Sequence, residues 1–247
     1  MKLFYLSVLI TPVLLLSPNP GAPGADSARE ALQHIARAHK QLAEAQHGQR
    51  DKIAVVQYSA ETTYTDLRLK KLTTSTAHFK LVSRAGTTFL TNGELDVYQD
   101  KQIQICIARA QRSILITQAQ VGEKLAPWTK LQADLVTQSL VADNSLVKTP
   151  AGLQRRITLL PTAASLLKGH VGSIEYYLNS RTDAPTRITM YYPAQAGLHS
   201  AAIVFEGQSW KTTDAAVDQP ILSHVYGPNQ QLLPVYQGFK VQDLRKS

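Results

Sequence analysis

A helical pattern opens the body of the chain. Residues of one face recur at helical spacing: Leu32, Ile35, His39 and Leu42. Ser27 and Glu30 stand in the arrangement of a capping box at its start, with Asp26 as an alternative cap, and Gly48 marks its end. The spacing predicts an amphipathic helix, which must pack against another element.

After this helix the period of apolar positions changes from about 3.6 to 2, which predicts strands. Asn92-Gly93 is a strong hairpin signal, and short polar turns separate the other runs. Together they predict an antiparallel meander. The predicted strands are 53–64, 78–83, 87–91, 95–97, 103–107 and 114–116.

The second half begins with a predicted break in the strands over 122–143, where Pro127 suits the first turn of a second amphipathic helix. Strands resume afterwards and are predicted at 153–160, 171–179, 187–192 and 201–206. Residues 207–220 are polar and predict a loop, and 232–244 predicts a last strand or strand pair. The fold class is therefore mainly β with some α, built on one large antiparallel sheet.

The N-terminus has the order of a secretory signal peptide. Lys2 precedes an apolar run over 3–16, which Ser17-Pro18-Asn19-Pro20 ends before a stretch of small residues. An uncleaved N-terminal anchor is the alternative interpretation. The chain is thus divided into a signal peptide at 1–25 and a single domain at 26–247.

Charge and cysteine content narrow the function classes. Lys and Arg total 26 against 18 Asp and Glu, a net charge of +8, but the basic residues are spread along the chain. The densest pairs, Lys70-Lys71 and Arg155-Arg156, have no flanking aromatic platform, so nucleic-acid binding is not expected. The single cysteine, Cys106, excludes an internal disulfide and a cysteine-ligated zinc site.

Motifs for catalysis are absent from the sequence. It contains no glycine-rich phosphate loop, no His-Glu-x-x-His and no Gly-x-Ser-x-Gly. The seven histidines have no obvious metal-ligand spacing, and the carboxylates are scattered. We therefore expect no enzyme activity, no metal and no cofactor.

A longer arrangement carries a family resemblance. A strand ends at Leu159-Leu160-Pro161, and a short insert leads to Gly172–Leu178, the turn Asp183–Arg187, and the runs Ile188–Tyr192 and Ile203–Phe205. With the preceding helix and meander, this order resembles the periplasmic outer-membrane lipoprotein carrier family of LolA and LolB. The resemblance covers roughly residues 31–205, and residues 234–245 are a C-terminal extension to it.

The resemblance implies a curved, incompletely closed antiparallel barrel or sheet whose concave side is covered by helices. It also implies an apolar cavity for acyl chains and a location in the periplasm. The expected partner is an acylated lipid or lipoprotein, with an envelope protein as a second possible partner, and the protein is expected to be a monomer.

These expectations give a first functional hypothesis, a periplasmic carrier or binding protein for an acylated ligand. Its predicted cavity is lined by Phe79, Leu81, Ile103, Ile105, Ile107, Ile114 and Ile116, with Trp128, Leu131 and Leu135 on the helical cover. The same residues also suit an ordinary filled core, so the alternative is a non-enzymatic envelope assembly or interaction protein on the same scaffold. A secreted hydrolase ranks third.

The signal-peptide prediction has a direct test. We expect cleavage between about Gly24 and Ala28, because small residues follow the apolar run there. Intact-mass measurement of the exported protein should show a chain that begins in this interval, and an exported chain that retains Met1 would contradict the prediction.

Overall fold

A computed structural model describes residues 25–47, 49, 51–119, 137–150, 152–165, 167–193 and 197–245. Residues 1–24 of the predicted signal peptide and the predicted lid residues Trp128, Leu131 and Leu135 lie outside these ranges. The larger elements are α1 (Ala25–His47), β1 (Ile53–Asp66), β2 (Lys71–Arg84), β3 (Thr87–Thr91), β4 (Leu95–Gln99), β5 (Ile103–Ala108), β6 (Ser113–Gln118), β7 (Ser139–Thr149), β8 (Gly152–Pro161), β9 (Ser173–Asn179), β10 (Pro185–Tyr191) and β11 (Leu198–Lys211). Shorter elements follow: α3 (Ala215–Asp218), η3 (Ile221–His224), η4 (Pro234–Tyr236) and β12 (Lys240–Asp243).

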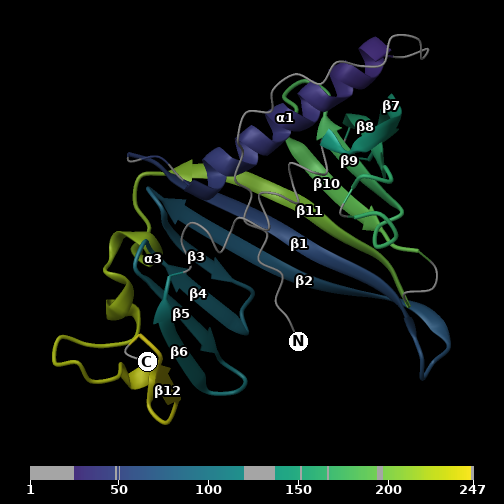
Figure 1. The fold of residues 1–247 in the computed structure, drawn as a ribbon. Helices are drawn as coiled ribbons and strands as arrows, with labels where there is room; N and C mark the ends of the chain where they lie inside the picture. The colour runs from purple at the N-terminus through teal and green to yellow at the C-terminus, as the bar shows by residue number, and fades with distance from the viewer. Residues whose placement is uncertain are drawn as a thin grey trace. The chain divides into compact units, whose positions relative to one another are not determined.

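The strands form one 12-stranded sheet in the order β12-β6-β5-β4-β3-β2-β1-β11-β10-β9-β8-β7 (Figure 1). The end strands β12 and β7 do not pair with each other, so the sheet is not closed into a barrel. Neighbouring strands pair antiparallel from β2 to β6 and from β11 to β7, whereas β12 runs parallel to β6. These features confirm the predicted fold class, a mainly β protein with an incompletely closed antiparallel sheet.

The chain forms two compact units. Unit 1 comprises the described residues within 25–43, 58–77 and 137–206, and unit 2 comprises those within 44–57, 78–119 and 207–245. Strands β1, β2 and β11 contribute residues to both.

In unit 1, the apolar face of α1 packs against strands β8 and β9 of the sheet. Its buried face combines alanine with larger apolar residues, namely Ala31, Ile35, Ala38 and Leu42. This confirms the predicted helix and its apolar face. The buried cluster consists of Ala31, Ile35, Ala38, Ile157, Leu159, Val171, Ile174, Tyr176 and Leu178.

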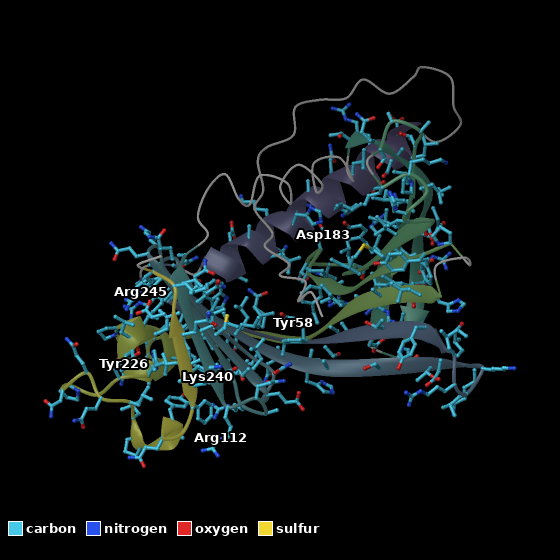
Figure 2. All side chains as sticks on the ribbon, turned by 60° about the horizontal axis from the view of Figure 1, so that its bottom comes forward. Tyr58, Arg112, Asp183, Tyr226, Lys240 and Arg245 are labelled. Carbon is cyan, nitrogen blue, oxygen red and sulfur yellow. The ribbon has the colours of Figure 1, made fainter. Side chains whose placement is uncertain are left out.

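A polar clasp holds α1 to the turn between β9 and β10. The Asp183 carboxylate lies 2.6 Å from His34 Nδ1 and accepts a hydrogen bond from Arg37 Nε at 2.5 Å (Figure 2). Burial opposes ionisation of Asp183, but the hydrogen bonds from Arg37 and His34 lower its pKa below the ordinary value. Gln41 adds a hydrogen bond to the carbonyl of Thr182 at 2.7 Å. The clasp therefore fixes the position of the helix along the strands of unit 1.

In unit 2, turns capped by side chains join β3 to β4 and β4 to β5. Asn92 Oδ1 accepts the N–H groups of Glu94 and Leu95. Gly93, which follows Asn92 in this turn, has a φ of +86°, a conformation that favours glycine. Asp100 Oδ1 caps the next turn in the same way. These turns confirm two of the hairpins predicted from the sequence and fix the register of β3, β4 and β5.

The C-terminal part of unit 2 corrects two predictions. Strand β11 continues to Lys211 and α3 follows, where the sequence predicted a polar loop over 207–220. Over 232–244, only β12 forms a strand that pairs with β6, and it follows the short helix η4. The N–H of Lys240 donates to the carbonyl of Arg112 at 2.9 Å beside this ladder (Figure 2). This segment packs on the isoleucines of β5 and β6, more than one hundred residues earlier in the chain, so its local sequence did not predict its structure.

Strand β7 corrects a third prediction. The sequence predicted a helical break over 122–143, but residues from Ser139 onward belong to β7. Ser139 pairs with Pro161, and the ladder then continues along β8 with a bulge after Val141. Pairing with β8 satisfies the backbone groups of a segment whose local pattern was ambiguous.

His39 on α1 gives the fold a testable pH dependence. Burial lowers its pKa to about 4 from the ordinary 6.5, and its Nε2 lies 3.2 Å from the Tyr176 hydroxyl. Because the unfolded chain then binds a proton more readily, stability should fall as the pH drops from about 6.5 towards 4. Urea unfolding at pH 7 and pH 5 should show this loss reduced by roughly 2 kcal/mol in His39→Gln. An equal loss in the variant would contradict the assignment.

Candidate functional site

Cross-strand register assembles an apolar row on one face of unit 2. In an antiparallel ladder, residues directly opposite each other project from the same face. Five strands, β2 to β6, contribute one residue each, and the row spans roughly 19 Å at the usual strand spacing. We call it the leucine row, and it consists of Leu81, Leu90, Val97, Cys106 and Leu115.

The leucine row is not part of a packed core among the described residues. Val97 is only 3% exposed, whereas the other four side chains are partly exposed. None of the five belongs to the three hydrophobic clusters that described residues form. The next row on the same face is polar and consists of Ser83, Thr88, Gln99, Gln104 and Thr117. The face therefore combines an apolar strip with a hydrogen-bonding edge.

The end of α1 lies on this face. Ser83, in the polar row, is buried and donates a hydrogen bond from its hydroxyl to the carbonyl of Ala45, in the last turn of α1. This bond satisfies one of the carbonyls that a helix leaves without a partner at its C-terminus. The leucine row is thus on the side of the sheet that the helix reaches within unit 2.

The opposite face of the same strands is filled. Its central row runs from Val82 through Phe89, Tyr98 and Ile105 to Ile116. The C-terminal segment packs on it and excludes water from the isoleucines. The buried cluster consists of Tyr98, Ile105, Ile107, Ile114, Ile116, Ile221, Val225 and Tyr236.

The predicted site residues divide between these two faces. Phe79 and Leu81 are partly exposed and project from the leucine-row face of β2. Ile105, Ile107, Ile114 and Ile116 are buried under the C-terminal segment, and Ile103 packs against the same cluster. Trp128, Leu131 and Leu135 lie outside the described residues. That the set lines a ligand cavity stays a prediction, and the structure brings only its isoleucines together.

Sequence reasoning missed Leu90, Val97 and Leu115. A signal for Leu90 and Val97 was present, because the hairpin turns at Asn92-Gly93 and Asp100 fix which residues of β3, β4 and β5 stand opposite one another. Working out the register from those turns places Leu90, Val97 and Cys106 in line, and the pairings of β2 with β3 and of β5 with β6 add Leu81 and Leu115.

Polar groups beneath the C-terminal segment have structural partners. The buried Asp96 carboxylate pairs with Arg109 and accepts the Thr91 hydroxyl at 2.6 Å. Tyr98 stacks on His224 with ring centroids 4.2 Å apart. Burial, with the nearby Asp96 charge, raises the pKa of Tyr98 to about 12, and burial lowers the pKa of His224, so both rings are neutral at pH 7. Within the described ranges, no group of three or more His, Cys, Asp or Glu residues could hold a metal ion.

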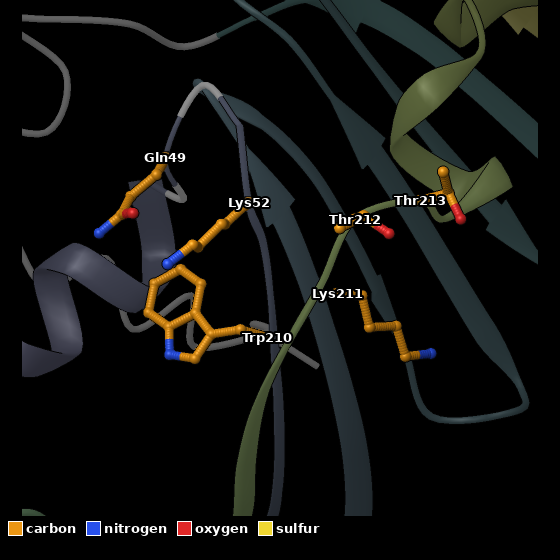
Figure 3. Close-up of a pocket in the computed structure, with 6 residues that line it drawn as sticks. All are labelled: Gln49, Lys52, Trp210, Lys211, Thr212 and Thr213. Atoms are coloured by element: carbon orange, nitrogen blue, oxygen red, sulfur yellow. The ribbon is translucent and has the colours of Figure 1, made fainter.

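A shallow hollow of about 650 Å³ lies beside the end of α1 in unit 2 (Figure 3). Trp210 is 41% exposed there, and Lys211 Nζ lies 3.7 Å from Asp214. The lining residues are Gln49, Lys52, Trp210, Lys211, Thr212 and Thr213.

Comparison with known proteins gives similarity only to solved structures. No protein-family model and no curated protein match the chain. An uncharacterized conserved protein from Thermus thermophilus is 10% identical, with a TM-score of 0.44, over 88% of this chain and 99% of that one. MucB in the Pseudomonas aeruginosa MucA/MucB complex is 12% identical, with a TM-score of 0.41, over 83% of this chain and 63% of that one.

A third similar structure is a LolA superfamily protein from Nitrosomonas europaea. It is 10% identical, with a TM-score of 0.33, over 78% of this chain and 97% of that one. LolA superfamily proteins, which the sequence resembles, are therefore among the solved structures similar to this chain. This chain spans less than two thirds of the MucB chain.

In the part of the chain that the structure describes, no helix combines the length and the apolar composition needed to cross a bilayer.

The assignment of the two faces predicts unequal effects of substitution. Ile105→Ala should lower the free energy of unfolding by ~2–5 kcal/mol, because it leaves a cavity in the buried cluster. The matched variant Leu115→Ala, on the neighbouring strand but the other face, should cost less since Leu115 is partly exposed. Urea unfolding of both variants measures the difference, and equal costs would contradict the assignment.

Proposed function

We propose that the protein is a non-enzymatic periplasmic binding or carrier protein for an acylated ligand, a lipid or a lipoprotein, and that the acyl chain lies along the leucine row. The observation that carries the proposal is the row itself: five aligned apolar residues on a sheet face, outside the packed clusters of the described residues. The filled isoleucine face cannot take a ligand without displacing the C-terminal segment.

The energetics favour an extended hydrocarbon as the occupant. Each methylene removed from water contributes ~0.8 kcal/mol, so a chain of ~12–16 carbons binds even after ordering costs are subtracted. The neighbouring polar row offers hydroxyl and amide groups to the ester or amide linkage of such a ligand. Among these, Gln104 Nε2 donates to Gln99 Oε1 at 3.3 Å, which leaves hydrogen-bonding capacity on both amides.

Two parts of this proposal, the periplasmic location and the lack of catalysis, rest on the sequence. The signal-peptide pattern predicts export, and the resemblance to the lipoprotein carriers predicts the periplasm. The sequence lacks the motifs that would assign a hydrolytic or phosphoryl-transfer chemistry.

A second candidate function is binding of an envelope protein. In unit 1, the face of β8 to β10 opposite α1 carries tyrosine and arginine, residue types enriched in interface hot spots. Tyr191 is exposed, and its hydroxyl donates to Glu175 at 3.1 Å. Arg187 pairs with Glu61 at 2.7 Å, and Arg156 pairs with Asp143 at 2.9 Å. These pairs hold the side chains in defined orientations, as a preformed protein-binding surface requires.

Binding of a fluorescent fatty acid tests the first proposal. Leu90→Gln places an amide in the middle of the leucine row and should weaken binding about tenfold, the equivalent of losing ~1.5 kcal/mol of apolar contact. The matched control Leu146→Gln changes an exposed leucine of β7 and should bind as the wild type does.

Native mass spectrometry of the purified protein provides the second readout, and we expect a co-purified lipid. Absence of saturable binding by folded wild-type protein, with no bound lipid, would exclude the acyl-carrier proposal and leave the protein-binding alternative. Circular dichroism of each variant checks that it is folded.

A further inference from the structure

The tip of the β1–β2 hairpin exposes an unusual amount of apolar surface. Leu67 is 86% exposed, Leu69 60% and Leu72 62%, and all three lie within unit 1. Single exposed leucines are common on proteins, but three within six residues at the end of a hairpin form a concentrated apolar site.

Cations alternate with these leucines. Arg68, Lys70 and Lys71 are all exposed, and Asp66 is the one acidic residue of the segment. The Asp66 carboxylate has a structural role, since its Oδ1 accepts the N–H groups of Arg68 and Leu69 at 2.8 and 3.0 Å. The tip therefore presents three positive charges to solvent beside its leucines.

The tip is a hydrogen-bonded turn at the end of two paired strands whose nearby residues are polar. Asp66 closes the turn from one side, and Lys70 adopts a positive φ of 48° that reverses the chain. Below the turn the paired strands carry threonines, and Thr63 and Thr74 share a hydrogen bond of 3.0 Å across them. Within residues 62–76 of this hairpin, leucines and basic residues thus occur only at 67–72.

We infer that this tip docks on an anionic lipid surface. The leucines would enter the interfacial region of the bilayer, and the three cations would contact lipid headgroups, a combination that binds a membrane reversibly. A protein partner is the less suitable occupant, because a stable protein interface buries about 800 Å² on each partner, more than one narrow turn supplies. The inference is independent of the proposed function, since the tip shares no residue with the leucine row.

Co-flotation with vesicles tests the inference. The wild-type chain should bind vesicles of phosphatidylethanolamine and phosphatidylglycerol at least tenfold more than vesicles of phosphatidylcholine alone, and 0.5 M salt should abolish most of this preference. Lys70→Gln with Lys71→Gln should weaken binding to the anionic vesicles roughly 30-fold, from the usual contribution of a basic residue near such a surface.

A second double variant addresses the leucines. Leu67→Ser with Leu69→Ser should weaken binding to anionic vesicles at least tenfold, whereas Leu146→Ser, another exposed leucine, should leave it unchanged. Thermal unfolding confirms the fold of each variant. Wild-type protein that fails to bind anionic vesicles, or tip variants that bind them as well as the wild type, would overturn the inference.

The fatty-acid assay separates this outcome from failure of the proposed function. Both tip variants should retain fatty-acid binding, because the leucine row is intact in them. Leu90→Gln should in turn retain vesicle binding.

Discussion

Cross-strand register is the constraint on which the rest of unit 2 depends. The turns at Asn92-Gly93 and Asp100 fix which residues of β3, β4 and β5 stand opposite each other, and a shift of one residue would exchange the two faces. With the observed register, isoleucines gather on one face and the leucine row on the other. The C-terminal segment covers the isoleucine face, so among the described residues the leucine row is the apolar strip that lies outside the packed clusters.

Local sequence signals were sufficient for most of the elements. The helix at α1 and strands β3 and β8 lie close to their predicted bounds, because helical periodicity, an Asn-Gly turn and a proline are local signals. The helix begins at Ala25, however, so the predicted caps Asp26 and Ser27 lie inside its first turn. The first residues of β7 and the helices after β11 were not predictable in this way. Their structure depends on partners outside the local sequence: Ser139 pairs with Pro161 of the next strand, and Ile221 packs in one cluster with Ile105.

The candidate site was predictable only in part for a related reason. The pattern Ile103, Ile105, Ile107 shows that one face of β5 is apolar, but it does not show whether a ligand or the protein itself fills that face. Ile221 and Val225, more than one hundred residues later in the chain, fill that face. The leucine row includes Cys106 and no isoleucine, so its apolar character is visible only after the strands are aligned.

The covering of the isoleucine face by the C-terminal segment has a consequence for the order in which the protein folds. Strands β3 to β6 can pair as soon as they are synthesised, because their turns are short. Their isoleucine face, however, stays in contact with water until residues 215–243 are available to close it. A nascent chain that has paired these strands therefore exposes one apolar surface to water until its last strand is available.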